Sequence, residues 1–345
     1  MKKTVTAALV ICVLHSVSAQ DFHFAQSDQT PLLINPAAAG VFDGWERIGI
    51  NHRSQWINTG TKFNTTSIAA DANLWKSTRR NSAHAGVGVL FYNDIGGDSK
   101  FGNQMGSLTI SGILPAGKSS TISAGIQGGF GQRKADLSGV SFMNQWDGTE
   151  FNESIISGEQ NVLTSFIYMD ASAGLYYVYR GRKSSFARNS DFKLKLGVSG
   201  YHLNSPKMKF INGSVDRLNR KYVAHVSVTG DIPGSRFAMD GSLLQFIQGG
   251  HYETLLGARV RYRFEDGTKI TGMNQNAYAG FGLQMRVKDA IIPSLLLDWG
   301  GFKFVLSYDV TISKLRRAYS GGSLEFSMVY VNKHHALFKS RKRRM

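Results

Sequence analysis

The sequence predicts an all-β fold: a transmembrane antiparallel β-barrel of the outer-membrane type, with about fourteen strands. Apolar and polar residues alternate over segments of about ten residues, which is the length that a tilted strand needs to cross a membrane. No stretch after residue 19 approaches the run of about eighteen apolar residues that a transmembrane helix requires. The chain is rich in glycine and aromatic residues and has only 6 prolines, as expected of long strands joined by turns.

Strand-like alternation recurs along the chain. In 259–264 arginines alternate with apolar residues, and in 302–310 Phe, Leu, Tyr and Val side chains share one face. Similar faces occur in 122–130, 193–199 and 281–288. Because successive side chains of a strand point to opposite faces, each of these segments has an apolar face and a polar face.

Two architectures share this alternation, the soluble β-sandwich and the transmembrane barrel. A sandwich packs its apolar faces into a core, whereas a barrel turns them to lipid and its polar faces to a wet lumen. Here the polar faces carry several basic residues of like charge, and the segments are longer than the roughly five or six residues usual in globular strands. Both features favour the barrel.

The expected strands follow one another from residue 44 to residue 332. They span 44–56, 63–75, 83–93, 104–114, 119–131, 164–179, 191–203, 220–231, 236–248, 251–264, 277–287, 290–299, 301–312 and 322–332. Single-chain bacterial barrels have even strand numbers, so twelve or sixteen strands stay open as alternatives. Residues 115–118 and 232–235 resemble tight turns, and 132–163 is the best candidate for an extracellular loop.

The N-terminus has the three parts of a secretory signal. Lys2 and Lys3 precede an apolar run, Val5 to Leu14, and Val17-Ser18-Ala19 forms a small-x-small cleavage site. We therefore expect a signal peptide over 1–19, a pre-barrel segment over 20–42, the barrel over 43–332 and a basic tail over 333–345. An even number of strands places both ends of the mature chain in the periplasm.

Cysteine content and charge narrow the class of protein. The single cysteine, Cys12, lies in the signal, so the mature chain has no disulfide, thiolate metal site or thiol nucleophile. The formal net charge of +16 does not indicate nucleic acid, because the chain is exported and has no nucleic-acid motif. Lipopolysaccharide, outer-membrane lipid and acidic proteins are anionic partners of the expected compartment.

Six short motifs follow one another along the mature chain. They are Gln20-Asp21-Phe22-His23-Phe24-Ala25-Gln26, Asn35-Pro36-Ala37 to Gly40, Arg53-Ser54-Gln55-Trp56, Gly86-Val87-Gly88 with Asn93-Asp94, Leu196 to Leu203, and Ser307-Tyr308-Asp309. In this order they resemble the PorP/SprF family of type IX secretion membrane proteins of Bacteroidota. Each motif is weak by itself, but their order and spacing cover nearly the whole mature chain. The chain departs from the family pattern at Ala25, where a serine is usual, and in the basic tail after Asn332.

The resemblance implies a non-enzymatic role in type IX secretion, with no cofactor. Family members help particular proteins across the outer membrane and hold them at the surface. The implied partners are translocon or periplasmic ring subunits and a secreted adhesin as cargo; whether the chain is a core subunit or a cargo-specific paralogue stays open. A channel for hydrophobic or anionic small solutes is the alternative function. An envelope lipase using His225 and Ser227 is disfavoured, because no third group is evident to orient the pair.

Three groups of residues are candidate functional sites. The family motifs supply Asn35, Pro36, Gly40, Arg53, Gln55 and Trp56. Phe142, Trp146 and Phe151 in the long loop form a partner-binding patch or fold over the barrel mouth. Arg259, Arg261, Arg263 and Arg286, with Lys193 and Lys195, form a basic lumen or simply a solvated, partly ion-paired face. The apolar pre-barrel residues favour insertion into the lumen, as in the fatty-acid-channel barrels that the Asn35-Pro36-Ala37 stretch resembles.

Overall fold

The structure is a computed structural model, and it describes eleven stretches of the chain. They are residues 21–56, 62–77, 82–97, 99–136, 140–152, 154–156, 165–181, 192–208, 216–266, 276–313 and 322–333. The expected signal peptide, 1–19, and the basic tail beyond Lys333 lie outside the described residues.

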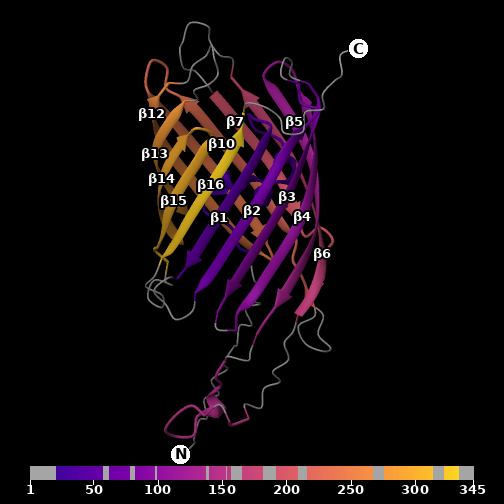
Figure 1. Ribbon diagram of the computed structural model, residues 1–345, viewed down its shortest axis with the longest axis vertical. Helices are drawn as coiled ribbons and strands as arrows, with labels where there is room; N and C mark the ends of the chain where they lie inside the picture. The colour runs from indigo at the N-terminus through magenta and orange to yellow at the C-terminus, as the bar shows by residue number, and fades with distance from the viewer. Residues whose placement is uncertain are drawn as a thin grey trace, which may run out of the picture.

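Fourteen strands form one closed barrel (Figure 1), which confirms the predicted fold. The strands are β1 (Glu46–Gln55), β2 (Phe63–Leu74), β3 (His84–Gly96), β4 (Phe101–Pro115), β5 (Ser120–Lys134), β6 (Ser165–Arg180), β7 (Phe192–Tyr201), β10 (Lys221–Asp231), β11 (Phe237–Gln248), β12 (His251–Glu265), β13 (Ala277–Arg286), β14 (Ala290–Trp299), β15 (Phe302–Thr311) and β16 (Ser323–Asn332). Two short strands, β8 (Lys207–Met208) and β9 (Asp216–Arg217), pair with each other outside the barrel.

Every barrel strand pairs antiparallel with its neighbours, and the first strand closes the barrel against the last. The β1–β16 seam runs without a register shift from Glu46 opposite Asn332 to Gln55 opposite Ser323. Closure leaves no strand edge exposed, which is the condition for a sheet to span a bilayer.

The two ends of the barrel differ. We call the end where β1 begins and β16 ends the near end, and the opposite one the far end; the near end is uppermost in Figure 1. The expected tight turns at 115–118 and 232–235 lie at the near end, where Gly117 and Gly234 have φ angles of +99° and +74° that glycine adopts without strain. The long β5–β6 connection lies at the far end.

Polarity is reversed relative to a soluble protein. The outward face is apolar, as Ile126 and Leu295 show with exposed fractions of 66% and 60%. The buried, lumen-facing residues are largely polar, and Asn51, Thr109 and Ser327 are at most 1% exposed. A sandwich would bury its apolar face, so this distribution decides for a membrane-spanning barrel.

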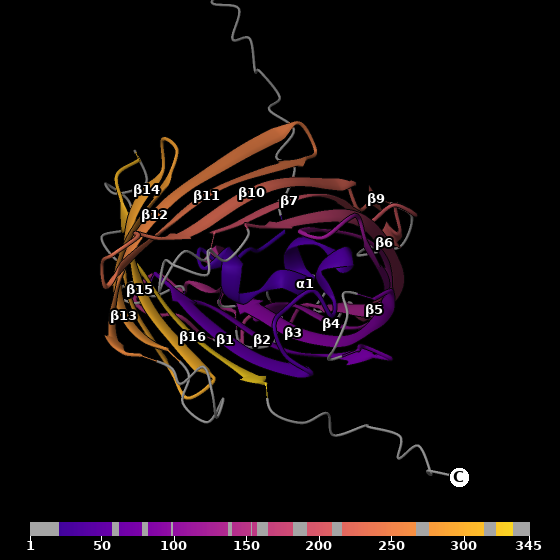
Figure 2. The same cartoon turned by 90° about the horizontal axis from the view of Figure 1, so that it is seen from above.

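The segment 21–45 lies inside the barrel, and we call it the plug (Figure 2). It contains three short helices, η1 (Ser27–Gln29), α1 (Pro31–Ile34) and η2 (Pro36–Ala38). Pro31 and Pro36 each occupy the first helical turn, where the missing N–H removes no hydrogen bond. No helix among the described residues is long and apolar enough to cross a membrane.

The apolar core of the molecule lies between the plug and the barrel wall. One cluster joins Ala37, Ala38 and Val41 of the plug to Ile113 and Val178. Further clusters seat Ala25 and Ile34 against β7, β10 and β11, and Leu32 and Ala39 against β3. Burial of these side chains therefore depends on the plug being in place.

Candidate functional site

The plug is fixed at the far end by a charged cluster. Nε2 of His202, the residue after β7, lies 2.5 Å from Asp21 Oδ2, and its Nδ1 lies 2.8 Å from Asp170 Oδ1 of β6. Gln248, the last residue of β11, accepts a hydrogen bond from the Asp21 backbone N–H at 2.9 Å. The plug thus begins at the far end, whereas β16 ends at the near end, so the expectation that both ends of the mature chain lie on the same side of the membrane is wrong.

The cluster shifts the titration of both partners. Burial alone would lower the pKa of His202, but the carboxylates of Asp21 and Asp170 raise that pKa to about 9. Burial alone would raise the pKa of Asp21, but His202, with Lys221 and Arg133 nearby, holds that pKa below its usual value. At neutral pH the cluster is therefore an imidazolium between two carboxylates.

Arg53 of the Arg53-Ser54-Gln55-Trp56 motif binds the plug directly. Its Nη1 donates to the carbonyl of His23 at 2.8 Å, and its Nη2 donates to Asp309 of β15 at 3.2 Å. Asp309 also accepts from Arg286 of β13 at 2.9 Å. Arg53 therefore joins two of the sequence motifs, and Arg286 is one member of an ion-pair network.

A buried glutamate on β16 accepts hydrogen bonds from two backbone N–H groups of the plug. Glu325 is 3% exposed and accepts the N–H groups of Ala25 and Gln26, each at 2.9 Å. Beside it, Arg259 of β12 donates to Gln26 at 2.9 Å and to Asp28 at 3.0 Å. These contacts join β16 and β12 to the first residues of the plug.

Asn35 joins the middle of the plug to two strands of the barrel wall. It is fully buried, and its amide donates to the carbonyls of Leu175 on β6 and Val198 on β7 at 2.9 and 3.2 Å. Its carbonyl oxygen accepts the N–H of Ala37 at 2.9 Å, which caps η2 at the position where asparagine is favoured. An aspartate could make only the cap, because it has no donor.

Gly40 ends the Asn35-to-Gly40 motif at a position that excludes a side chain. Its φ angle is +72°, and a Cβ there would lie 2.8 Å from the Gly86 Cα. The Gly40 N–H donates to Asp71 of β2 at 2.8 Å, and Asp71 also forms a two-bond ion pair with Arg47 of β1. The motif thus ends on a charged pair in the wall.

Glycines in the wall let the plug approach the strands closely. A Cβ at Gly86 of β3 would lie 2.3 Å from the Ala39 carbonyl oxygen, and one at Gly125 of β5 would lie 2.7 Å from the Ala37 backbone. A Cβ at Gly174 of β6 would lie 2.1 Å from the Asn35 side chain. Small residues in the plug and glycines in the wall are therefore two halves of one contact.

The near end of the plug is held by a second ionic contact. Asp43 lies 2.5 Å from the Lys193 ammonium of β7 and 3.2 Å from the Arg180 guanidinium of β6. Burial would raise the pKa of Asp43, but Lys193 and Arg180 lower it. This contact and the His202 cluster hold the plug at opposite ends of the lumen.

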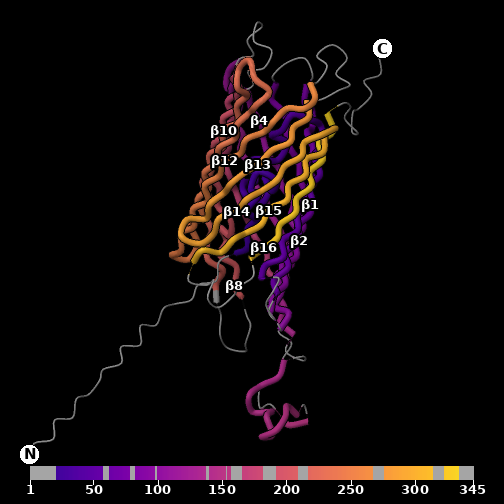
Figure 3. The backbone as a smooth tube through the Cα atoms, turned by 90° about the vertical axis from the view of Figure 1, so that its left-hand side faces the viewer, coloured from indigo at the N-terminus to yellow at the C-terminus, as the bar shows by residue number. Residues whose placement is uncertain are grey.

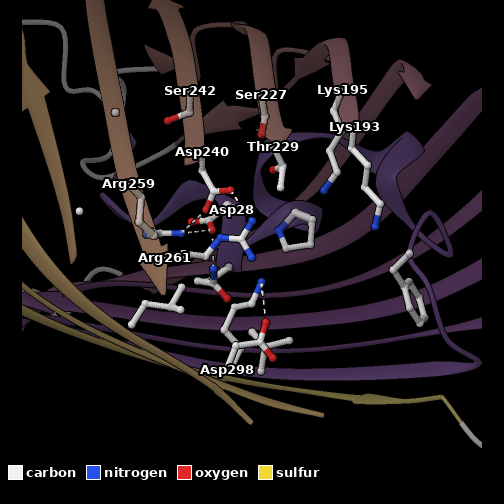
Figure 4. Close-up of a pocket in the computed structure, with 18 of the residues that line it drawn as sticks. Asp28, Lys193, Lys195, Ser227, Thr229, Asp240, Ser242, Arg259, Arg261 and Asp298 are labelled. Atoms are coloured by element: carbon white, nitrogen blue, oxygen red, sulfur yellow. Dashed lines mark hydrogen bonds and ion pairs between the residues drawn. The ribbon is translucent and has the colours of Figure 1, made fainter. Parts of the chain in front are cut away.

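The lumen arginines singled out in the sequence all face inward and carry ionic partners. Arg261 lies 2.8 Å from Asp240, Arg263 lies 2.7 Å from Asp266, and Arg286 lies 2.8 Å from Asp289. The structure thus places these arginines, with Arg259, in ion pairs with the plug and the wall. Lys195 is an exception, and it lines a cavity of about 310 Å³ at the near end (Figure 4).

Gln55 and Trp56 lie apart from the plug. They end β1 at the far end, where the Trp56 backbone N–H donates to the Gly322 carbonyl at 3.1 Å. The Trp56 ring packs edge-on against Phe63 at 5.1 Å. These two motif residues therefore lie beside the start of β16 and the start of β2.

The long loop carries an aromatic knob, which we define as residues 140–156 where described. Trp146 and Phe151 pack edge-on with ring centroids 5.2 Å apart, and each is about half exposed. Asp147 accepts the N–H groups of Thr149 and Glu150, which closes the turn between them. The knob extends away from the barrel at the far end (Figure 1 and Figure 3), so it does not fold over the mouth.

The His225–Ser227 pair has no orienting partner within the described ranges. The His225 ring packs on Tyr176 at 5.1 Å, and its Nδ1 is buried without a hydrogen bond. Ser227 lines the near-end cavity. The described part of the chain also contains no group of three or more side chains that could hold a metal ion.

Sequence reasoning did not identify most of the wall residues that hold the plug. Ser199 and Tyr201 of β7 donate to the carbonyls of Ile34 and Leu32 at 2.6 and 3.0 Å. They lie with His202 inside the motif Leu196 to Leu203, so this motif is the sequence feature that could have identified them. Glu325 gave no signal beyond its charge on an otherwise apolar and hydroxylic strand.

A closed antiparallel barrel with an apolar outer face, a polar wall and a segment of its own chain in the lumen is an outer-membrane β-barrel protein. The family model described as type IX secretion system membrane protein PorP/SprF matches residues 16–330. The chain therefore belongs to the PorP/SprF family of type IX secretion system membrane proteins. The family resemblance in the sequence motifs is thereby confirmed.

Other comparisons add little. No curated protein matches the chain at a significant level. Among solved structures, the toluene transporter TbuX of Ralstonia pickettii is similar at 8% identity and a TM-score of 0.45, over 87% of this chain and 92% of that one. The translocator domain of the autotransporter NalP of Neisseria meningitidis is similar at 11% identity and a TM-score of 0.39, over 89% and 96%. Likeness at this level says nothing of function.

The wall glycines generate a first prediction. Gly86→Ala places a methyl group against the Ala39 backbone, and overpacking of this kind costs about 1–3 kcal/mol. We expect a lower temperature for loss of the folded, heat-modifiable band on gels and faster proteolysis of the plug. Gly112→Ala is the matched control. Gly112 of β4 pairs with Ala85 of β3, next to Gly86, and a Cβ at Gly112 would meet nothing within 4 Å. Equal behaviour of the two variants would contradict the close-packing account.

The His202 cluster generates a second prediction. A histidine whose pKa rises on folding stabilises the fold fully below its unfolded pKa of about 6.5, and that stabilisation is lost as pH rises through about 9. Its upper limit is of order 3 kcal/mol. We measure the free energy of unfolding in urea for the native protein and for His202→Gln. The difference between the two should be largest at pH 6 and should disappear by pH 10. A difference that does not change with pH would contradict a charged cluster.

Proposed function

We propose that the chain serves type IX secretion through protein–protein contacts, helping particular secreted proteins, such as adhesins, to cross the outer membrane or stay attached at the surface. The near end faces the periplasm, where it meets translocon or periplasmic ring subunits. The far end faces outward and meets the cargo. Family membership supports the secretion role, and the plug supports a role in contact rather than passage.

The plug is the observation that carries this proposal. It runs from the His202 cluster at the far end to Asp43 at the near end, and wall side chains bond it along its length. The cavity of about 40 Å³ at the far end is too small for a solute larger than a water or two. A lumen so occupied favours an anchor over the alternative, a channel for hydrophobic or anionic solutes.

The aromatic knob supports a partner contact at the far end. Met143 and Ile156 are 89% and 90% exposed, beside the half-exposed Trp146 and Phe151. Exposed aromatic residues on a folded turn anchor protein interfaces with little loss of conformational entropy. The connection from 135 to 164 also contains five acidic residues and no basic residue, in a chain whose net charge is +16. A basic surface with apolar pockets on a secreted protein suits such a knob.

The lengths of two far-end connections support this orientation. Outer-membrane barrels have short periplasmic turns and longer extracellular loops. The connection of 135–164 and the β8–β9 hairpin both lie at the far end. The near end therefore faces the periplasm, together with both ends of the barrel domain.

Conductance separates the anchor from the channel. In planar bilayers the purified full-length protein should show no steady open-channel current, because the plug occupies the lumen. A variant lacking residues 24–39, refolded and checked for a heat-modifiable band, is the positive control and should conduct. Steady current through the native protein would refute the plugged anchor and favour the solute channel.

Co-purification tests the secretion role. The tagged protein, extracted from its native outer membrane in mild detergent, should bring down a large secreted adhesin or translocon subunits, identified by mass spectrometry. The double variant Trp146→Ala/Phe151→Ala should lose at least about tenfold of the adhesin, as expected for hot-spot truncation of about 1.4 kcal/mol or more. Trp75→Ala, at the near end and 83% exposed, is the control. Recovery of the barrel alone would count against the secretion role.

A further inference from the structure

The near-end cavity is a second feature of the lumen, distinct from the plug contacts. It has a volume of about 310 Å³, at the lower end of the range of ligand pockets. Residues of the plug and of strands β1, β6, β7 and β10 to β16 line it, and Figure 4 shows several of their side chains. Asp28 of the plug lines it and has a side chain that is 37% exposed, so solvent enters the cavity.

The lining is strongly basic. Eight lysine and arginine residues face four aspartates, and no glutamate is present. Each aspartate already has a cationic partner: Asp28 pairs with Arg259, Asp43 with Lys193, Asp240 with Arg261, and Asp298 with Lys303. The last of these is a weak contact at 3.9 Å. The cavity therefore has more positive charge than its own acids neutralise.

Lys195 is the cation without a partner. Among the described residues it has neither an ion pair nor a hydrogen bond, and Figure 4 shows its side chain extending from β7 into the cavity beside Lys193. The charges that act on it most strongly are three cations, which include Lys193 and Lys303, and one acid, Asp28. A flexible ammonium among like charges, with its only acid already bound to Arg259, leaves a place for an added anion.

Further donors on the same wall are also unsatisfied. The Ser294 hydroxyl of β14 and the Nε atoms of Arg259 and Arg261 are buried without a hydrogen-bond partner. Gly282 of β13 brings two of them together: a Cβ there would lie 2.5 Å from Ser294 Oγ and 3.3 Å from Arg259 Nε. Buried donors without acceptors are rare in folded proteins, and an acceptor that enters from outside is one way to satisfy them.

We propose that this cavity binds an oxyanion ligand, the carboxylates of an acidic peptide segment that enters from the near end. Lys195 supplies the free charge, and the Ser294–Arg259 pair supplies donors across the cavity. The donors are distributed from β7 to β14, so a chain bearing several carboxylates reaches more of them than one small anion does. The inference needs only the cavity and its charge and does not depend on the secretion role.

The test uses the full-length protein in detergent and two fluorescent hexapeptides, hexaglutamate and hexaglutamine, with inorganic phosphate as a competitor. Hexaglutamate should bind saturably and at least tenfold more tightly than hexaglutamine. Binding should weaken as salt rises from 50 to 300 mM, which are chosen conditions on either side of about 0.15 M. Lys195→Met should weaken hexaglutamate binding about five- to tenfold, since it removes the one unpaired charge while keeping the length of the side chain.

Lys134→Met is the matched control, because Lys134 is exposed at the far end of β5 and should leave binding unchanged. Each variant is first checked for a native heat-modifiable band. Displacement of the peptide by millimolar phosphate would support the oxyanion site and identify a free anion as its ligand; resistance to phosphate would support the peptide. No saturable binding of either anion, or equal binding by native protein and Lys195→Met, would overturn the proposal.

Discussion

Hydrogen bonds between the barrel wall and the backbone of the plug determine most of this structure. A backbone placed in a lumen loses its water, and each buried polar group left unpaired costs about 1–3 kcal/mol. The wall therefore supplies partners at intervals. Ser111, Ser123 and Ser199 each donate to a plug carbonyl, at 2.7, 2.7 and 2.6 Å. Glu325 accepts two plug N–H groups from the opposite side of the barrel. The residues that bond the plug come from strands early and late in the chain, so plug and wall fix each other.

Electrostatics serves the same arrangement. A chain with a net charge of +16 would be expected to have an open, repulsive lumen, yet most of its inward cations contact an acid. Several of those acids, Asp21, Asp28 and Asp43, belong to the plug itself. The plug thus carries negative charge to places where the wall is positive. In the near-end cavity that Lys195 lines, by contrast, cations outnumber acids.

The sequence was informative about periodicity and less so about partnership. Alternation alone located all fourteen barrel strands to within a few residues, because the period of two is imposed locally by the strand and by lipid outside it. Composition also predicted the inserted segment. Which side chain meets the plug depends on the path of the plug through the lumen, and no local pattern encodes that path. Arg53 and Asn35 were singled out as motif residues, but their contacts, with His23 and with the carbonyls of β6 and β7, needed the structure. Lys195, which has no ionic partner among the described residues, differs from the paired Lys193 only in the side chains that surround it.

The position of the plug also constrains how the molecule can be made. The plug precedes β1 in the chain, yet the seam that encloses it is formed by β16, and Ala25 contacts Glu325 across 300 residues of sequence. A ring that is already shut would have to admit the segment through one of its mouths, past ionic contacts at both. Folding is simpler if the first residues lie along the inner surface of an unfinished, curved sheet while the last strand arrives to complete it. The plug then acts as an internal template for assembly. The final step of biogenesis pairs the first strand, β1, with the last strand, β16, around it.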